Sequence, residues 1–136
     1  TNSPSKTIGS FIPMKLPILT FLSFFSLFAM ANDVRSIKAQ ELLTTDTSNW
    51  LVIDVQSSEE YLQGHVPGAI NIAHSSIKEH FTQLESFRDK TIVLYCKSGY
   101  RAGKAAKVLS GMGFGDLRHL KGDMQAWSNA GLPIEK

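Results

Sequence analysis

Four short apolar runs in the sequence constrain the fold more than any other feature. They are WLVIDV (50–55), AINIA (69–73), TIVLYC (91–96) and the weaker DLRHL (116–120). All four are rich in Val, Ile and Leu, and none alternates cleanly between apolar and polar residues, as a half-exposed strand would. Continuous apolar strands are buried on both faces, as in a parallel sheet covered by helices. We therefore expect these runs to be strands of such a sheet.

Helix signals lie between these runs. The segments Ser57 to Glu60 and Ser76 to Glu79 each fit the S-x-x-E capping box, in which the two side chains satisfy free amides of a first helical turn. A longer helix is expected from about Gly99 to Met112, because its alanines and leucine form one apolar stripe. Shorter helices are expected at 39–43 and from Asp123 onward.

The alternation of strand and helix predicts a doubly wound α/β domain with right-handed crossovers. Sheets of this kind bind ligands beyond the carboxyl ends of their strands, where the strand order reverses. Cys96 is the last residue of one predicted strand. We therefore expect Cys96 to lie at the ligand-binding edge of the sheet.

Residues 14–31 have the features of a secretory signal peptide. Met14 and Lys15 precede sixteen uncharged, mostly apolar residues that close on Ala29-Met30-Ala31, a small-x-small cleavage pattern. The alternative is an uncleaved membrane anchor, but the run is shorter than the roughly 20 residues that span a bilayer. We expect cleavage near Asn32 and no stable membrane insertion afterwards. Residues 1–13 show no periodicity and are interpreted as a vector-derived or upstream segment, which leaves 32–136 as the folded domain.

The charge of the predicted mature chain gives no sign of nucleic-acid binding. From residue 32 onward, 12 Lys and Arg residues balance 12 Asp and Glu residues. Any electrostatic function must come from local clustering, because there is no overall basicity to attract a polyanion. The sequence contains one cysteine, so an exported domain could form no internal disulfide, and its unpaired thiol requires an explanation.

The segment CKSGYR, Cys96 to Arg101, places this cysteine between a strand and a helix. Successive amides of a loop at a helix N-terminus form a positively polarised nest that stabilises a thiolate. Gly99 permits the required backbone curl, and Lys97 and Arg101 add full positive charges. We predict that Cys96 is the nucleophile and that Lys97, Ser98, Gly99, Tyr100 and Arg101 form its substrate-binding loop.

Two other interpretations of the cysteine remain open. A lone cysteine that ends an apolar strand can be an inert core residue, although the flanking Gly, Lys and Arg favour reactivity. Cysteine phosphatases and arsenate reductases also use a cysteine followed by an arginine. The phosphatase loop is C-x5-R, however, whereas four residues separate Cys96 from Arg101. The tighter loop suits the transfer of a single sulfur atom.

The pattern C-x-x-G-x-R resembles the active-site loop of the rhodanese family of thiosulfate sulfurtransferases. The segments LVIDVQSSEEYLQGHVPGAINI (51–72) and HLKGDMQAW (119–127) are similar to two further motifs of single-domain rhodaneses. With the leader, the chain is most similar to the periplasmic, phage-shock type, so we expect a periplasmic location. The resemblance also implies a rhodanese-like domain over 32–136, doubly wound, with a mainly parallel sheet of about five strands and helices on both faces.

The resemblance implies an activity as well. The Cys96 thiolate would take the outer sulfur of thiosulfate or a similar small anionic donor as a persulfide, then pass it to cyanide, another thiol or a protein thiol. No metal and no organic cofactor are expected, because the sulfur itself is carried. A noncatalytic rhodanese-like binding module is the main alternative function.

A few residues near these motifs are less easily assigned. Gln56 stands where the family pattern has arginine, and Asp123 stands where a second glycine is common, so we interpret Asp123 as the N-cap of the last helix. Asp54 either supports the active-site loop or serves as an ordinary turn carboxylate. The four histidines lack the paired spacing of a metal site and are interpreted as structural or solvated.

Overall fold

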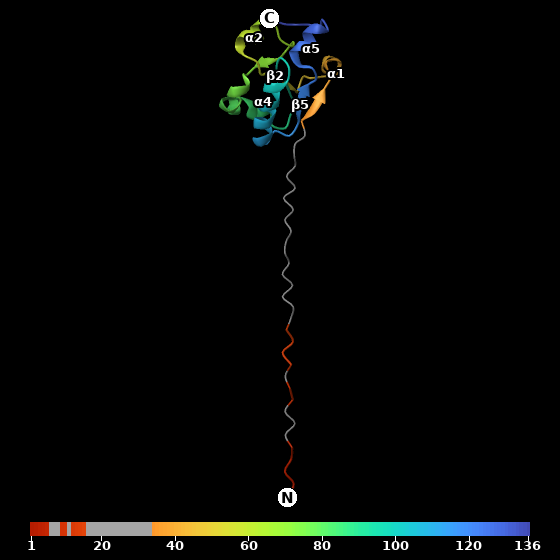
Figure 1. Ribbon diagram of the computed structural model, residues 1–136, viewed down its shortest axis with the longest axis vertical. Helices are drawn as coiled ribbons and strands as arrows, with labels where there is room; N and C mark the ends of the chain where they lie inside the picture. Colours follow the sequence, from red (N-terminus) through yellow and green to blue (C-terminus); the bar gives the residue numbers. More distant parts are fainter. Residues whose placement is uncertain (6–8, 11, 16–33) are drawn as a thin grey trace.

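The computed structural model describes residues 1–5, 9–10, 12–15 and 34–136 (Figure 1). Apart from Met14 and Lys15, the predicted signal peptide lies outside these residues. No helix in the described part of the chain is long and apolar enough to cross a membrane. The division into 1–13, 14–31 and 32–136 stays a prediction.

The folded part of the chain is built on one parallel sheet of five strands, in the order β1-β5-β4-β2-β3. The strands are β1 (Arg35–Ile37), β2 (Leu51–Asp54), β3 (Ile70–Asn71), β4 (Ile92–Tyr95) and β5 (Leu117–Leu120). The continuous apolar runs therefore form the buried parallel strands that the sequence predicts. In the register of β2 and β4, Asp54 lies opposite Tyr95.

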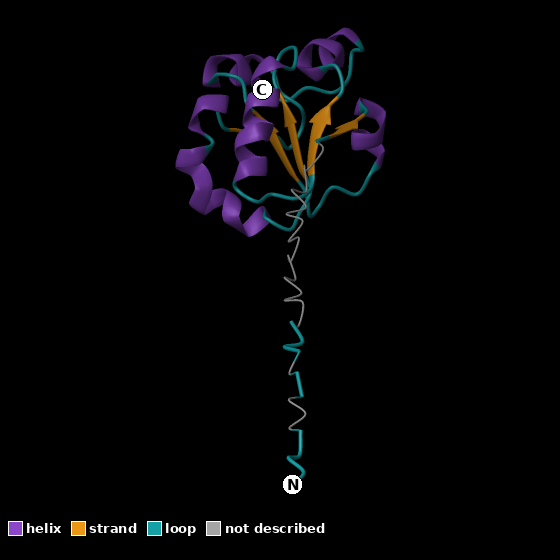
Figure 2. Ribbon diagram, turned by 60° about the horizontal axis from the view of Figure 1, so that its bottom comes forward, coloured by secondary structure: helices purple, strands orange, loops and turns teal. Residues whose placement is uncertain are grey.

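Helices pack on both sides of this sheet (Figure 2). The α-helices are α1 (Ala39–Thr44), α2 (Ser58–Gln63), α3 (Phe81–Leu84), α4 (Tyr100–Gly111) and α5 (Asp123–Asn129). The capping box of α2 is confirmed, because the Ser57 hydroxyl accepts the Glu60 amide at 3.3 Å and the Glu60 carboxylate accepts the Ser57 amide at 2.9 Å. Helix α4 ends one residue before Met112, and Gly113 follows with a φ of +91°.

The second predicted capping box, Ser76 to Glu79, is wrong. The segment forms two short 3-10 turns, η1 (His74–Ser76) and η2 (Lys78–His80), and no side chain caps either of them. A further turn, η3 (Glu85–Phe87), follows α3. The amide of His80 bonds to the carbonyl of Ile77, three residues back, so Glu79 does not occupy the third position of a continuous α-helix.

The alternation of side chains along β4 divides the core into two clusters, one on each face of the sheet. Ile92, Leu94 and Cys96 belong to the cluster that contains the buried residues of α4. Val93 and Tyr95 belong to the opposite cluster, which contains Trp127 of α5. Strand β4 therefore supplies both cores and positions the residue that follows it.

We predict that Leu94→Ala destabilises the fold by about 2–5 kcal/mol, because it removes buried methyl groups from the centre of the sheet. Leu94 is fully buried, whereas the side chain of Leu62 on α2 is 66% exposed. Leu62→Ala is therefore the matched control and should change stability by less than about 0.5 kcal/mol. Urea unfolding of both variants measures the difference, and equal losses would contradict the packing described for β4.

Candidate active site

Cys96 lies at the carboxyl end of β4, where the order of the strands reverses. The chain leaves β2 toward β3 at one edge of the sheet, whereas it leaves β4 through α4 toward β5 on the other side. The ends of β2 and β4 therefore flank the crevice at which open α/β sheets bind ligands. Cys96 is 1% exposed and belongs to the core cluster on the α4 side.

The backbone curl after Cys96 brings an amide onto its sulfur. The N–H of Gly99 donates to the Cys96 Sγ, with a nitrogen to sulfur distance of 3.0 Å. Gly99 precedes α4 as its N-cap and has a φ of +111°, which side chains rarely adopt. A Cβ at this position would also lie 3.1 Å from the Asp123 Oδ2 and 3.2 Å from the His119 Cε1. The backbone conformation therefore favours a glycine here, and a larger residue would also crowd Asp123 and His119.

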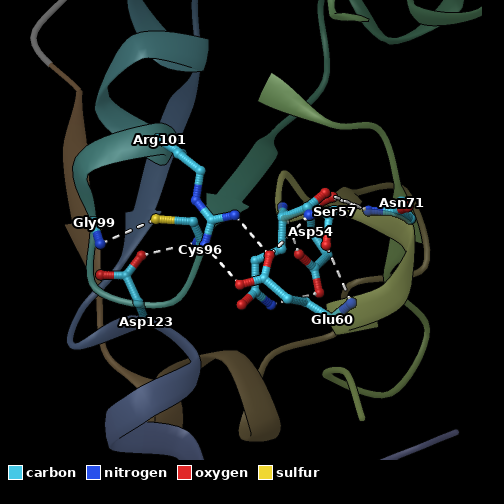
Figure 3. Close-up of polar contacts among 9 residues, drawn as sticks. Asp54, Ser57, Glu60, Asn71, Cys96, Gly99, Arg101 and Asp123 are labelled. Carbon is cyan, nitrogen blue, oxygen red and sulfur yellow. Dashed lines mark hydrogen bonds and ion pairs between the residues drawn. The ribbon is translucent and has the colours of Figure 1, made fainter. Parts of the chain in front are cut away.

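The Arg101 guanidinium lies beside Cys96 and forms a two-pronged ion pair with Glu60 of α2 (Figure 3). The nitrogen to oxygen distances are 2.6 and 3.1 Å. This ion pair connects the segment after β4 to the segment after β2 across the crevice. Glu60 is also the capping-box glutamate of α2, so one carboxylate serves both the helix start and the site.

The ion pair shifts the pKa of both partners. The hydrogen bonds from Arg101 lower the pKa of Glu60 to about 2, against the opposing effect of burial. The same hydrogen bonds raise the pKa of Arg101, and the nearby Cys96 raises it further. Glu60 is therefore ionised throughout the physiological range, and the positive charge of Arg101 is largely balanced before any substrate binds.

The expectation that Asp123 caps α5 is wrong. Gly122 is the N-cap, and the Asp123 side chain turns away from the helix toward the active-site loop. Its Oδ1 accepts the N–H of Cys96 at 3.0 Å (Figure 3). The same Oδ1 lies 2.8 Å from the His119 Nε2. The amides of Met124 and Gln125 donate to the carbonyls of Cys96 and Lys97, at 2.9 and 3.1 Å. The first turn of α5 thus holds the backbone of the active-site loop.

Asp54 makes no hydrogen bond to the loop. Its carboxylate accepts the backbone and side-chain N–H groups of Gln56 at 2.9 and 3.1 Å, and the hydroxyl of Tyr95 also bonds to it. Burial raises the pKa of Asp54 in spite of these hydrogen bonds. The residue at the position of the family arginine is thus a neutral partner of a buried carboxylate.

The remaining loop residues are exposed. Tyr100 is 73% exposed. The ammonium group of Lys104 lies over the Tyr100 ring, 4.7 Å from the ring centroid. Ser98 and Lys97 also face solvent. Lys97 borders an open cleft of about 370 Å³ together with Gln56 and Glu60. The cleft gives a small ligand room beside the loop.

In the described part of the chain, no three His, Cys, Asp or Glu side chains are grouped closely enough to hold a metal ion. The histidines are dispersed, and His119 is the one that lies at the loop, through Asp123. The hydrogen bond to Asp123 raises the pKa of His119, although partial burial opposes the shift.

The sequence did not indicate three residues of this site: Glu60, His119 and Asp123. Glu60 was recognised only as a capping residue, and 41 positions separate it from Arg101. The departure of Asp123 from the family pattern is the one signal in the sequence. The sequence does not show, however, whether this side chain caps α5 or turns toward the loop. The structure brings together Cys96, Gly99 and Arg101 of the predicted site.

Comparisons with known proteins agree with this geometry. Residues 38–130 match the family described as "Rhodanese-like domain". A sulfurtransferase of Allochromatium vinosum is 31% identical over 105 residues, which cover 77% of this chain and 95% of that protein. The thiosulfate sulfurtransferase PspE of Escherichia coli is 37% identical over 70 residues, which cover 52% of this chain and 67% of that protein. Some other relatives are longer, and the chain spans less than half of their length.

A solved structure shows the same architecture. The crystal structure of a rhodanese-related protein from Thermoplasma volcanium superposes with a TM-score of 0.64 at 32% identity. The match covers 74% of this chain and 97% of that protein. Strands β2 to β5 and the loop after β4 lie within the matched family region at 38–130, and β1 lies just before it.

We predict that Glu60→Gln lowers the free energy of unfolding by about 1 kcal/mol at pH 7, as expected for a partly exposed ion pair. Glutamine retains the capping box, so the change isolates the charge. A carboxyl with a lowered pKa contributes stability above its unfolded pKa and loses it as the pH falls through the folded value. The difference between the two proteins should therefore shrink from about pH 4.5 to about pH 2.

Urea unfolding at pH 7, 4 and 2.5 measures this difference. Glu79→Gln is the control, because Glu79 is an exposed glutamate on η2 and should contribute less than about 0.5 kcal/mol. A loss in Glu60→Gln that stays constant over this pH range would contradict the ion pair with Arg101.

Proposed function

Because the chain belongs to the rhodanese family, we propose that it is a thiosulfate sulfurtransferase that carries sulfur as a persulfide on Cys96. The proposal depends mainly on one observation: the Gly99 amide donates to the Sγ of Cys96 at the start of α4. Amides fixed around a sulfur stabilise its thiolate and the charge that develops on the sulfur during transfer.

The first half of the reaction loads the cysteine. The Cys96 thiolate attacks the outer sulfur of thiosulfate, and a new sulfur–sulfur bond forms. The bond between the outer sulfur and the sulfonate sulfur breaks, and its electron pair leaves with sulfite. The outer sulfur remains on Cys96 as a persulfide anion.

The second half of the reaction transfers the outer sulfur from Cys96 to an acceptor. The carbon of cyanide, or the sulfur of a thiolate, attacks the outer sulfur of the persulfide. The sulfur–sulfur bond breaks, and its electron pair returns to the Cys96 Sγ. Thiocyanate or a new persulfide leaves, so no net electron donor, metal or organic cofactor is needed.

Arg101 and Lys97 would position the anionic donor. A guanidinium has five N–H donors, and the ion pair with Glu60 uses two of them, so others remain for the Cys96 sulfur and for a substrate oxygen. Lys97 is exposed at the edge of the adjoining cleft and adds a mobile positive charge. Cyanide, a small thiol or a protein thiol could approach through the same cleft as acceptor.

The sequence of residues 14–31 supports export to the periplasm, and we include this location in the proposal. Expression from Met14 in a bacterial host should give a periplasmic protein that begins near Asn32. Osmotic-shock fractionation and N-terminal sequencing test this, and recovery of the uncut chain in the membrane fraction would support the anchor instead.

Intact mass spectrometry of the purified domain gives the direct test of sulfur transfer. We expect thiosulfate to add one sulfur, about 32 Da, and cyanide to remove it as thiocyanate. Cys96→Ser should keep the fold and gain no mass. A folded wild-type protein that gains no mass would favour the binding module, and turnover of phosphate esters or arsenate would favour the phosphatase or arsenate reductase.

We predict that Arg101→Ala lowers kcat/KM for thiosulfate by about tenfold or more, because it removes a charged hydrogen-bond donor. Lys104→Ala is the matched control, since Lys104 lies on the same helix and its ammonium contacts Tyr100. Steady-state thiocyanate formation and urea unfolding are measured for both variants. A loss of stability in Arg101→Ala that accounts for the whole loss of activity would make Arg101 structural.

A further inference from the structure

Asp123 places a buried carboxylate at the base of the active-site loop. The residue is 3% exposed, and its φ of +56° is unusual for any residue other than glycine. Its side chain does not cap α5, so the helix start does not account for it. A glycine would adopt this backbone conformation without cost, and what aspartate adds is the carboxylate itself.

This carboxylate lies close to the nucleophile. Its Oδ1 accepts the backbone N–H of Cys96, which withdraws one amide from the donors that could bind an anion. Its Oδ2 faces Gly99, whose own amide holds the Sγ. A negative charge at this position opposes the binding of an anionic donor unless another group balances it.

His119 is the group that can balance the charge. Its Nε2 lies 2.8 Å from the Asp123 Oδ1, and its side chain is 32% exposed, so solvent protons can reach it. The hydrogen bond to Asp123 raises its pKa, which extends the protonated form to higher pH. With His119 protonated, the pair is neutral, and with His119 neutral, the charge of Asp123 is left unbalanced.

The other groups around His119 leave this assignment intact. Lys107 of α4 borders the same cavity of about 250 Å³ and does not pair with the imidazole in the described structure. From β1, the residue in register with His119 is Ser36, which is uncharged. From β4, the residue in register is Leu94. Asp123 of α5 is the charged group that acts directly on the imidazole.

We propose that the Asp123–His119 pair determines whether Cys96 reacts preferentially with anionic or with uncharged reactants. This inference builds on the proposed sulfur transfer. Protonated His119 favours anionic donors such as thiosulfate. Neutral His119 disfavours them relative to uncharged reactants. Asp123 and His119 are thus positioning and specificity-determining residues, which act through the loop and do not react themselves.

Alkylation of Cys96 by iodoacetate and by iodoacetamide tests the inference without any sulfur transfer. Iodoacetate is an anion and iodoacetamide is neutral. The ratio of interest is the rate constant with iodoacetate divided by that with iodoacetamide. The thiolate fraction and the access to the sulfur affect both rates and cancel in this ratio. The single cysteine makes the reaction unambiguous. The ratio should fall by about fivefold between pH 5.5 and 9.5 in the wild-type protein, as expected for one nearby charge.

Three variants complete the experiment. Asp123→Asn should give a higher ratio than the wild type at every pH, and its ratio should fall at a lower pH, because His119 still titrates without the carboxylate. His119→Gln should give a low ratio at every pH. Lys107→Gln is the matched control, and its ratio should fall over the same pH range as in the wild type. A ratio at pH 9.5 in Asp123→Asn no higher than that of the wild type would overturn the inference. Asp123→Gly replaces Asp123→Asn if circular dichroism shows that the latter is unfolded.

A second measurement tests the pair itself. NMR titration of the His119 ring should give a lower midpoint in Asp123→Asn than in the wild type, and an unchanged midpoint would overturn the inference. Failure of the proposed function has a different signature. A wild-type protein with the expected alkylation ratios but no persulfide would reject sulfur transfer and retain the charge control by Asp123 and His119.

Discussion

The hydrogen bonds between the first turn of α5 and the backbone after β4 are the interaction on which the rest of the site depends. The Cys96 N–H donates to the Asp123 carboxylate. The carbonyls of Cys96 and Lys97 accept the amides of Met124 and Gln125. These contacts exist because β5 pairs in parallel with β4 and delivers α5 to the same edge of the sheet. The curl that places the Gly99 amide on the sulfur is therefore imposed by a segment 27 residues away from Cys96.

Two carboxylates define the electrostatics of the site. Glu60 pairs with Arg101 on the α2 side of Cys96 (Figure 3). Asp123 bonds to the Cys96 amide and to His119 on the α5 side. The loop carries two cations, Lys97 and Arg101. In the folded protein the carboxylates of Glu60 and Asp123 lie nearby, so the net charge around Cys96 is close to zero. A balanced site holds a dianion less tightly than a bare cationic loop would, which would favour release of sulfite in the proposed first half-reaction.

Local patterns predicted much of this fold. The apolar runs identify β2 to β5, and the Ser57 capping box identifies α2, because both signals depend on neighbours in the sequence. Strand β1 is not among these runs, because its three residues include an arginine and a serine. The Ser76 pattern failed because the same four residue types can lie across two 3-10 turns. The loop from Cys96 to Arg101 was identified as a unit, whereas the role of Asp123 was misread. Its partners are Cys96, just after β4, and His119 in the adjacent strand β5, and their proximity is a property of the sheet order.

The alternation of side chains along β4 links correct folding to the environment of Cys96. Tyr95 and Cys96 point into opposite cores, and a shift of the strand by one residue would exchange their faces. Such a misregistered chain could still bury apolar side chains on both faces, because every residue of β4 is buried. Its thiol, however, would lie away from α4 and the Gly99 amide. Reactivity of Cys96 therefore reports the register of the central strand, which compactness or helix content alone would not reveal.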